Sequence, residues 1–166
     1  MARLAMFFDR DGVINIAPPL GEYVTTPEQF RLRPGAAEAI AAANAAGYLV
    51  IVVTNQRGVA LGLMTLADLD AVHEKMRREL AAAGAHVDDI FVCTHDRDAN
   101  CECRKPRPGM ILAAARKWNI DLARSFVLGD SERDIEAGER AGCRTVRITE
   151  DYGPLEAVRD ILAGKR

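Results

Sequence analysis

Acidic side chains occur at two places in the chain where they could hold a metal ion. Asp9 and Asp11 follow one short apolar run, and Asp130 follows another. Residues two apart along an extended chain project to the same side, so Asp9 and Asp11 can face one ligand together. Carboxylates that converge in one crevice repel each other unless a cation is present, and oxygen ligands suit Mg²⁺. The sequence therefore predicts a magnesium site beside these carboxylates.

A hydroxyl group, amide groups and two cations follow two other apolar runs. The segment 54–56 reads Thr-Asn-Gln, and Arg104 and Lys105 lie farther along. A Mg²⁺ ion flanked by Lys, Arg and a hydroxyl suits a phosphoryl group, whose transfer depends on neutralising charge. One carboxylate can attack phosphorus and form an aspartyl phosphate, while a second handles the proton of the leaving group. These residue types favour phosphoryl transfer.

Three cysteines and one histidine form a second candidate metal site. The residues are Cys93, His95, Cys101 and Cys103. Three thiolates and one imidazole make a closed ligand set that is typical of structural zinc, bound at about 2.0–2.3 Å. In a reducing compartment such a cluster is more often a metal site than a disulfide framework. Zinc would fix the loop that carries the two cations. Cys143, which stands apart in an apolar setting, is expected in the core.

The motifs require a scaffold that brings them together, and the apolar pattern predicts one. Five apolar runs, each suited to a buried parallel strand, lie at 4–8, 48–53, 90–93, 126–128 and 145–148. Helical patterns lie at 34–46, 65–83, after Pro108-Gly109, between Ser131 and Gly142, and at 155–162. This alternation predicts a Rossmann-like, doubly wound α/β sheet with three layers, α/β/α. Ligands bind beyond the carboxyl ends of the strands in such sheets, so we expect the motifs to converge there.

Composition limits the class of protein. The chain has 166 residues, 49% of them hydrophobic and 28% charged, with a formal net charge of −2. These values predict one globular domain over 1–166 and no binding to nucleic acid, which would call for a basic surplus. No apolar run reaches the roughly 18–20 residues of a membrane span. Asp9 interrupts the first apolar run, so we expect no signal peptide, a cytoplasmic location and no membrane partner. We also expect a monomer.

Four short motifs follow the expected strands in a fixed order. They are Phe7-Phe8-Asp9-Arg10-Asp11-Gly12-Val13, Thr54-Asn55-Gln56, Lys105-Pro106, and Gly129-Asp130 with Asp134. In this order they resemble the motifs of the haloacid dehalogenase (HAD) phosphatase superfamily, over residues 4 to about 148. The resemblance implies that Asp9 is the nucleophile and that Asp11 protonates the leaving oxygen and then activates water. Thr54 and Lys105 would hold the phosphoryl oxygens.

The same resemblance implies a ligand set for magnesium. Asp9, the backbone carbonyl of Asp11, and Asp130 would bind the ion. Asp134 would orient Lys105 from outside the ligand shell. Because only short loops interrupt the expected sheet, the resemblance is to members of the superfamily that have no cap domain.

The zinc loop, together with Asn55-Gln56-x-Gly58 and Cys-x-Cys-Arg-Lys-Pro, resembles one branch of this superfamily. The branch contains the D-glycero-D-manno-heptose 1,7-bisphosphate 7-phosphatases and the histidinol-phosphate phosphatases. The stretches at 55–62 and 105–110 are more similar to the heptose enzymes. The short zinc loop and Pro18-Pro19 are more similar to the histidinol enzymes, and Ser131 stands where heptose enzymes often carry lysine.

Giving the two longer stretches more weight, we expect a phosphatase that acts on a small phosphorylated sugar and removes the 7-phosphate of the heptose bisphosphate. In this interpretation Asn55, Gln56, Arg57 and Arg104 contact the substrate. Histidinol phosphate is the alternative substrate. Two further alternatives are a non-catalytic, zinc-stabilised module that binds phosphate esters, and a transferase that passes the phosphoryl group to a sugar.

Overall fold

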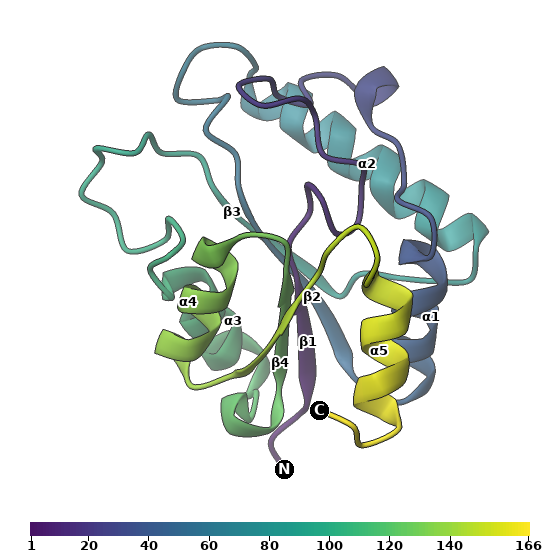
Figure 1. Ribbon diagram of the computed structural model, residues 1–166. Helices are drawn as coiled ribbons and strands as arrows, with labels where there is room; N and C mark the ends of the chain where they lie inside the picture. Colours follow the sequence, from purple (N-terminus) through teal and green to yellow (C-terminus); the bar gives the residue numbers. More distant parts are fainter.

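Five short segments form the strands of one parallel sheet in the computed structural model, which describes all residues from Met1 to Arg166. They are β1 (Ala5–Phe8), β2 (Leu49–Asn55), β3 (Asp89–Cys93), β4 (Phe126–Gly129) and β5 (Arg144–Arg147). The strand order is β3-β2-β1-β4-β5, and all neighbouring strands run parallel (Figure 1). Strand β1 is central and fully buried, as expected for a strand that is apolar on both faces. The predicted doubly wound sheet is confirmed.

Five α-helices connect the strands and cover both faces of the sheet. They are α1 (Ala36–Ala45), α2 (Leu66–Ala82), α3 (Gly109–Trp118), α4 (Glu132–Ala141) and α5 (Pro154–Leu162). Met6 and Phe8 of β1 pack with α1, α2 and α5 in one apolar cluster, whereas Ala5 and Phe7 pack with α3 and α4 in another. This alternation along β1 builds the three predicted layers. All five α-helices pack on the sheet, so the chain carries no separate cap domain.

Local sequence explains where the longest helix begins and where another one ends. Thr65 and Asp68 form a capping box at the start of α2, in which each side chain accepts a hydrogen bond from the other residue's backbone N–H (2.8 and 3.1 Å). Gly142 adopts a positive φ of 85° directly after α4, where a side chain would be strained. The two caps agree with the helical patterns expected at 65–83 and between Ser131 and Gly142.

The expectation of uniformly buried strands is wrong at the edges of the sheet. Arg144 and Arg147 of β5 are exposed, and most of β3 is only half-buried. An edge strand has a neighbour on one side only, so its flanks stay open to solvent, and charged residues are favoured there. The central strands β1, β2 and β4 are buried as predicted.

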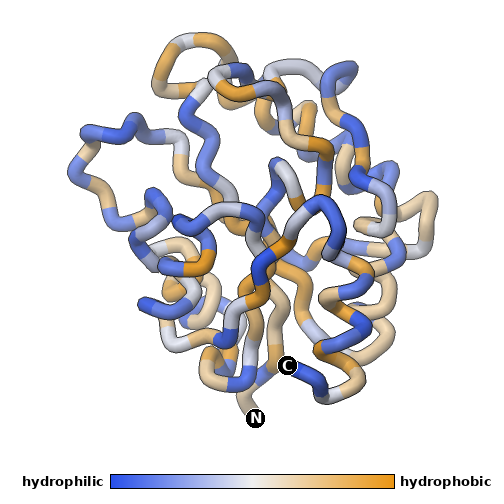
Figure 2. Tube along the Cα trace, in the orientation of Figure 1, coloured by the Kyte–Doolittle hydropathy of each residue, from blue (hydrophilic) through white to orange (hydrophobic).

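Two long segments run between the regular elements near the carboxyl edge of the sheet. Segment 15–33 contains the short 3₁₀-helix η1 (Pro27–Gln29), and a second such turn, η2 (Leu122–Arg124), precedes β4. Segment 94–108 forms an extended loop that is mostly hydrophilic, in contrast to the hydrophobic strands (Figure 2). None of the helices combines the length and the apolar character that crossing a bilayer requires.

Candidate active site

A cleft of about 320 Å³ opens at the carboxyl edge of the sheet, where the predicted motifs meet. Asp9 follows β1, Asn55 ends β2, and Asp130 follows β4; all three line the cleft. Lys105 reaches the cleft from the loop after β3, and Asp134 lies in the first turn of α4. The parallel sheet explains this convergence, because all carboxyl ends of its strands lie at one edge.

Lys105 is the centre of a buried ion group. Its Nζ atom donates hydrogen bonds to Asp9 Oδ1 at 2.9 Å, to Asp134 Oδ1 at 2.6 Å and to the carbonyl oxygen of Val53 at 2.9 Å. The residue is only 4% exposed. Burial alone would lower the pKa of Lys105, but the charges of Asp9 and Asp134 outweigh it and raise the pKa. The ammonium group therefore remains charged at neutral pH.

The carboxylates of Asp9, Asp130 and Asp134 form a cluster whose chemistry fits a divalent cation. Each offers an oxygen within 4.8 Å of those of the others. Burial raises the pKa of Asp9 well above its usual value, and the charges of Asp134 and Asp130 add to this rise against the opposing effect of Lys105. Burial and the charge of Asp134 also raise the pKa of Asp130. A bound Mg²⁺ would relieve this crowding of negative charge.

The turn after Asp11 brings the backbone against Asp130. Gly12 has a φ of +90°, and a Cβ atom built on it would lie 1.9 Å from Asp130 Oδ2. Only glycine combines that backbone conformation with such a close approach. The motif thus fixes the distance between the loop after β1 and the carboxylate after β4.

Asp11 is held by four hydrogen bonds from three side chains. Oδ1 accepts from Arg10 Nε at 3.2 Å, Arg10 Nη2 at 3.0 Å and Asn15 Nδ2 at 2.9 Å, while Oδ2 accepts from Gln56 Nε2 at 3.1 Å. Burial favours a raised pKa for Asp11, but the charge of Arg10 and these hydrogen bonds outweigh it and lower the pKa. In this arrangement the Asp11 side chain is a carboxylate at rest.

Three consecutive residues at the end of β2 occupy different places. Asn55 lines the cleft and pairs with the backbone of Lys105, accepting from its N–H at 3.1 Å and donating to its carbonyl at 3.2 Å. Gln56 is 2% exposed and donates to Asp11 and to Thr54 Oγ1 (2.9 Å). Its side chain is thus oriented into the protein, and Gln56 is not among the residues that line the cleft. Thr54 is also buried, beneath the cleft, 1% exposed.

Arginine side chains form the rim of the cleft. Arg57 donates to Asp96 at 2.5 Å and lies 3.5 Å from the Tyr23 hydroxyl, so it links three loops. Arg104 lines the cleft as expected, together with Arg97 and Arg133, which the sequence reasoning missed. Their positions could have indicated this role. Arg97 lies between the zinc-ligand candidates, and Arg133 lies in the first turn of α4.

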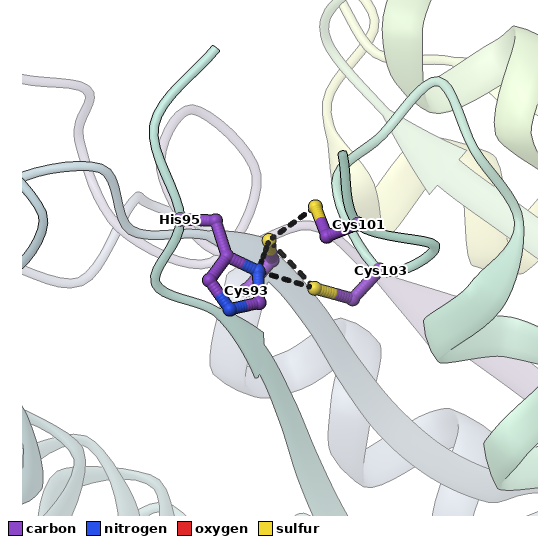
Figure 3. A group of neighbouring side chains, drawn as sticks. All are labelled: Cys93, His95, Cys101 and Cys103. Carbon is purple, nitrogen blue, oxygen red and sulfur yellow. Dashed lines mark hydrogen bonds between the residues drawn. The ribbon is translucent and has the colours of Figure 1, made fainter. Parts of the chain in front are cut away.

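The Cys/His residues lie together where β3 ends, and their chemistry fits zinc (Figure 3). Cys93 Sγ is 2.8 Å from Cys103 Sγ, 3.9 Å from Cys101 Sγ and 3.6 Å from His95 Nδ1. A tetrahedral zinc site keeps its ligand atoms roughly 3.3–3.8 Å apart, given bonds of about 2.0–2.3 Å. The sulfurs form no disulfide. All four ligand atoms lie within 4.8 Å of one another, and one zinc ion would fit between them after Cys93 Sγ and Cys103 Sγ move slightly apart. Cys103 is two residues before Lys105.

The fold and the site define a class of protein that comparison with known families identifies. The family model described as haloacid dehalogenase-like hydrolase matches residues 4–142. The chain belongs to this family of hydrolases, as the four motifs predicted.

Particular relatives share most of the chain. It is 48% identical over 147 residues to the D-glycero-beta-D-manno-heptose-1,7-bisphosphate 7-phosphatase of Rhodopseudomonas palustris, which covers 84% of this chain and 80% of the relative. It is 44% identical over 138 residues to the protein of the same name from Bordetella bronchiseptica, covering 83% of this chain and 76% of that one.

A solved structure supports the same relationship. The D,D-heptose 1,7-bisphosphate phosphatase from B. bronchiseptica, in complex with magnesium and phosphate, superposes with a TM-score of 0.89. The two chains are 36% identical, and the match covers 98% of this chain and 99% of that chain. The whole architecture is therefore shared with a phosphatase that binds the ion predicted for the acidic cluster.

Proposed function

We propose that this protein is a magnesium-dependent phosphomonoesterase that removes the 7-phosphate of D-glycero-β-D-manno-heptose 1,7-bisphosphate. The observation that carries the proposal is the buried ion group of Lys105, Asp9 and Asp134 beside Asp130 in the cleft. The names of the relatives at 48% and 44% identity support the choice of substrate and anomer.

In the first step, the carboxylate of Asp9 attacks the phosphorus of the ester. The bond between phosphorus and the sugar oxygen breaks, and an aspartyl phosphate forms on Asp9. Asp11, once protonated, gives its proton to the departing oxygen. Lys105 stabilises negative charge on the phosphoryl oxygens, and Thr54 would add a hydroxyl donor.

In the second step, Asp11 takes a proton from water. The water oxygen attacks the phosphorus of the aspartyl phosphate, the bond to Asp9 breaks, and inorganic phosphate leaves. The carboxylate form of Asp11, held by Arg10 and its other donors, is the form that this step needs. The proton that Asp11 takes from water then stays on its carboxyl group and serves the leaving oxygen of the next ester.

Two metal ions fit the residues present. Asp9, the carbonyl of Asp11, and Asp130 would hold Mg²⁺, which would neutralise charge on the phosphoryl group when bound. Cys93, His95, Cys101 and Cys103 would hold Zn²⁺ in a closed site with a structural role. Asp134 would orient Lys105 through the 2.6 Å hydrogen bond described above.

The arginine rim supports a substrate with two phosphates. Arg97, Arg104 and Arg133 line the cleft beyond the catalytic carboxylates, and the charges of Arg133 and Arg97 add to burial in lowering the pKa of Arg104. The positive charges of these arginines repel one another, and an anion bound between them would relieve that repulsion. We assign the second phosphate to this rim, with Asn55 and Arg57 contributing polar contacts to the sugar.

We also propose that the enzyme acts as a monomer in the cytoplasm. Arg144 and Arg147 lie exposed on the edge strand β5, where charge opposes pairing with a second sheet. The four free cysteines suit a reducing compartment. Sedimentation of the purified protein tests the first point, and fractionation of the source cells tests the second.

Parallel kinetics on three esters test the function: both anomers of the heptose bisphosphate, and histidinol phosphate. We expect kcat/KM for the β anomer to exceed that for histidinol phosphate by about 100-fold or more, with the 1-phosphate left on the product. A preference for histidinol phosphate would overturn the substrate and leave the mechanism intact. Binding without phosphate release would favour the non-catalytic module. Phosphoryl transfer to added sugars in place of water would favour the transferase.

A further inference from the structure

His73 is a buried histidine outside the four motifs that contacts Arg10, the residue of the first motif that binds Asp11. It lies in α2 and is only 7% exposed. Its Nε2 atom is 3.1 Å from Nη1 of Arg10, a residue that is completely buried. His73 does not line the cleft, so it does not touch a substrate bound there.

The contact fixes the protonation state of the histidine ring. A guanidinium group has donors only, so Nε2 of His73 must accept the hydrogen bond and the ring proton must lie on Nδ1. Burial lowers the pKa of His73 to about 3, and the charges of Arg10 and Arg77 act in the same direction against that of Asp11. Asp70, Glu74 and Asp89 line a hollow on the outer side of the ring.

The same contact gives the third guanidinium nitrogen of Arg10 a hydrogen-bond partner. Nε and Nη2 of Arg10 both donate to Oδ1 of Asp11, at 3.2 and 3.0 Å. Nη1 points the other way and donates to His73. A buried donor without a partner costs about 1–3 kcal/mol, so removing the acceptor would favour another orientation of the guanidinium. The orientation of Arg10 in turn sets where the Asp11 carboxylate lies.

We infer that His73 is a positioning residue for the general acid and base Asp11, acting through Arg10. The inference rests on the proposed function, because it assigns His73 to the proton-transfer part of that reaction. The helix α2 thereby supports the reacting atoms through one chain of hydrogen bonds, His73 to Arg10 to Asp11. Such support matters because proton transfer in a transition state depends strongly on the placement of the acid.

The first experiment compares leaving groups in two variants. His73→Gln keeps an acceptor oxygen near the position of Nε2, whereas His73→Leu removes the acceptor and keeps an apolar volume. The substrates are p-nitrophenyl phosphate, phenyl phosphate and an alkyl phosphate, whose leaving groups need increasing help from an acid. We expect kcat/KM of His73→Leu to fall about 10- to 100-fold on the alkyl ester and much less on the p-nitrophenyl ester. His73→Gln should restore the wild-type pattern.

Two results would overturn the inference. An equal loss of kcat/KM on all three esters would assign His73 to general stability, and so would a failure of His73→Gln to restore the pattern. If the wild-type protein released no phosphate from these esters or from the heptose bisphosphates, the proposed function itself would fail, and this inference with it.

The second experiment needs no catalysis and therefore separates the two claims. Nitrogen NMR of the ¹⁵N-labelled protein at pH 7 should show the ring of His73 neutral, with its proton on Nδ1. The signal should be assigned by its loss in His73→Gln. A protonated ring, or a proton on Nε2, would contradict the hydrogen bond to Arg10 and overturn the inference, whatever the activity of the enzyme.

Discussion

The Nζ atom of Lys105 lies 2.9 Å from Oδ1 of Asp9, although 96 residues separate them in the chain. The pairing joins the first motif to the third across β2, and it offsets part of the negative charge that Asp130 and Asp134 impose on Asp9. Because Asp9, the proposed nucleophile, and Lys105 are both buried, replacing either residue changes the net charge of the buried cluster. This relationship makes the role of each member testable.

Asp9→Asn should abolish turnover and leave the fold intact. Asparagine has nearly the volume of aspartate but cannot form the aspartyl phosphate, so we expect phosphate release to fall by about 10⁴-fold or more. Circular dichroism and zinc content should match those of the wild-type protein. Substantial phosphate release by the folded variant would remove Asp9 from the role of nucleophile.

Asp134→Asn should weaken catalysis through Lys105. Asparagine lacks the charge that helps hold the Lys105 ammonium, so kcat should fall about 10- to 100-fold while the helix start is largely kept. Glu136→Gln is the matched control, because Glu136 lies on the same helix and pairs with the exposed Arg140. We expect less than a twofold change there. Equal effects in the two variants would argue against orientation of Lys105 by Asp134.

Gly12→Ala should impair metal binding more than it impairs folding. Its new Cβ atom would collide with the Asp130 carboxylate, 1.9 Å away. Gly47→Ala is the control, since Gly47 has a similar φ of +84° and nothing within 4 Å. Both substitutions carry backbone strain of about 1–2 kcal/mol. Only Gly12→Ala should raise the magnesium concentration needed for half-maximal activity, by about tenfold or more; a similar rise in Gly47→Ala would contradict this.

Cys103→Ala should lose the zinc ion, and Cys143→Ala should keep it. Cys103 belongs to the Cys/His cluster, whereas Cys143 is buried in the core on the side of α3 and α4, where burial raises the pKa of its thiol to about 12. Metal analysis should find about one zinc in Cys143→Ala and almost none in Cys103→Ala. Activity should fall in Cys103→Ala, because the loop that carries Lys105 would no longer be held by the metal ion. Full activity without zinc would refute the structural role.

His73 should make stability depend on pH. Its pKa is about 3 in the folded protein, lowered by burial, against 6.5 as the ordinary value. The unfolded chain therefore binds a proton that the folded one does not, and this contribution to stability is complete above pH 6.5 and is lost as the pH falls toward 3. Relative to His73→Gln, the wild-type free energy of unfolding should fall by about 1.4 kcal/mol for each pH unit between pH 6.5 and pH 3.

Urea unfolding at pH 7 and pH 5 measures this difference, and the loss should be about 2 kcal/mol larger in the wild-type protein than in His73→Gln. His86→Gln is the control, because the His86 side chain is 65% exposed. His86→Gln should keep the pH dependence of the wild-type free energy of unfolding, whereas His73→Gln should lose part of it. Identical behaviour of wild type and His73→Gln would show that the ring is not buried in the neutral form.

The scaffold could be predicted because its signals are local and repeated. The apolar runs that form β1, β2 and β4 are buried as expected. Thr65 lies at the start of α2, and Gly142 lies at the end of α4. Convergence of Asp9, Asp130 and Lys105 followed from the rule that strand ends share one edge. The exposure of β5 could not be read from its sequence alone, because it depends on which strand lies at the edge.

Side-chain direction at the site was the harder part. Gln56 follows directly after Asn55, yet one side chain is buried against Asp11 and the other lines the cleft. The contact between Arg10 and His73 joins residues 63 apart through the packing of α2, which no local pattern encodes. The same holds for Arg97 and Arg133, whose place on the rim depends on how the loop and α4 meet.

The Cys/His cluster has a consequence for how the enzyme can change over evolution. A metal ion bound by all four residues would fasten the chain at 93–95 and again at 101–103, and would close the segment 96–100 into a turn of its own. Substitutions in that turn would alter the rim of the cleft, because Arg97 lines the cleft and Asp96 pairs with Arg57. They would not displace Lys105, which follows the Cys/His cluster. Substrate range and catalytic power can thus diverge independently in descendants of this gene.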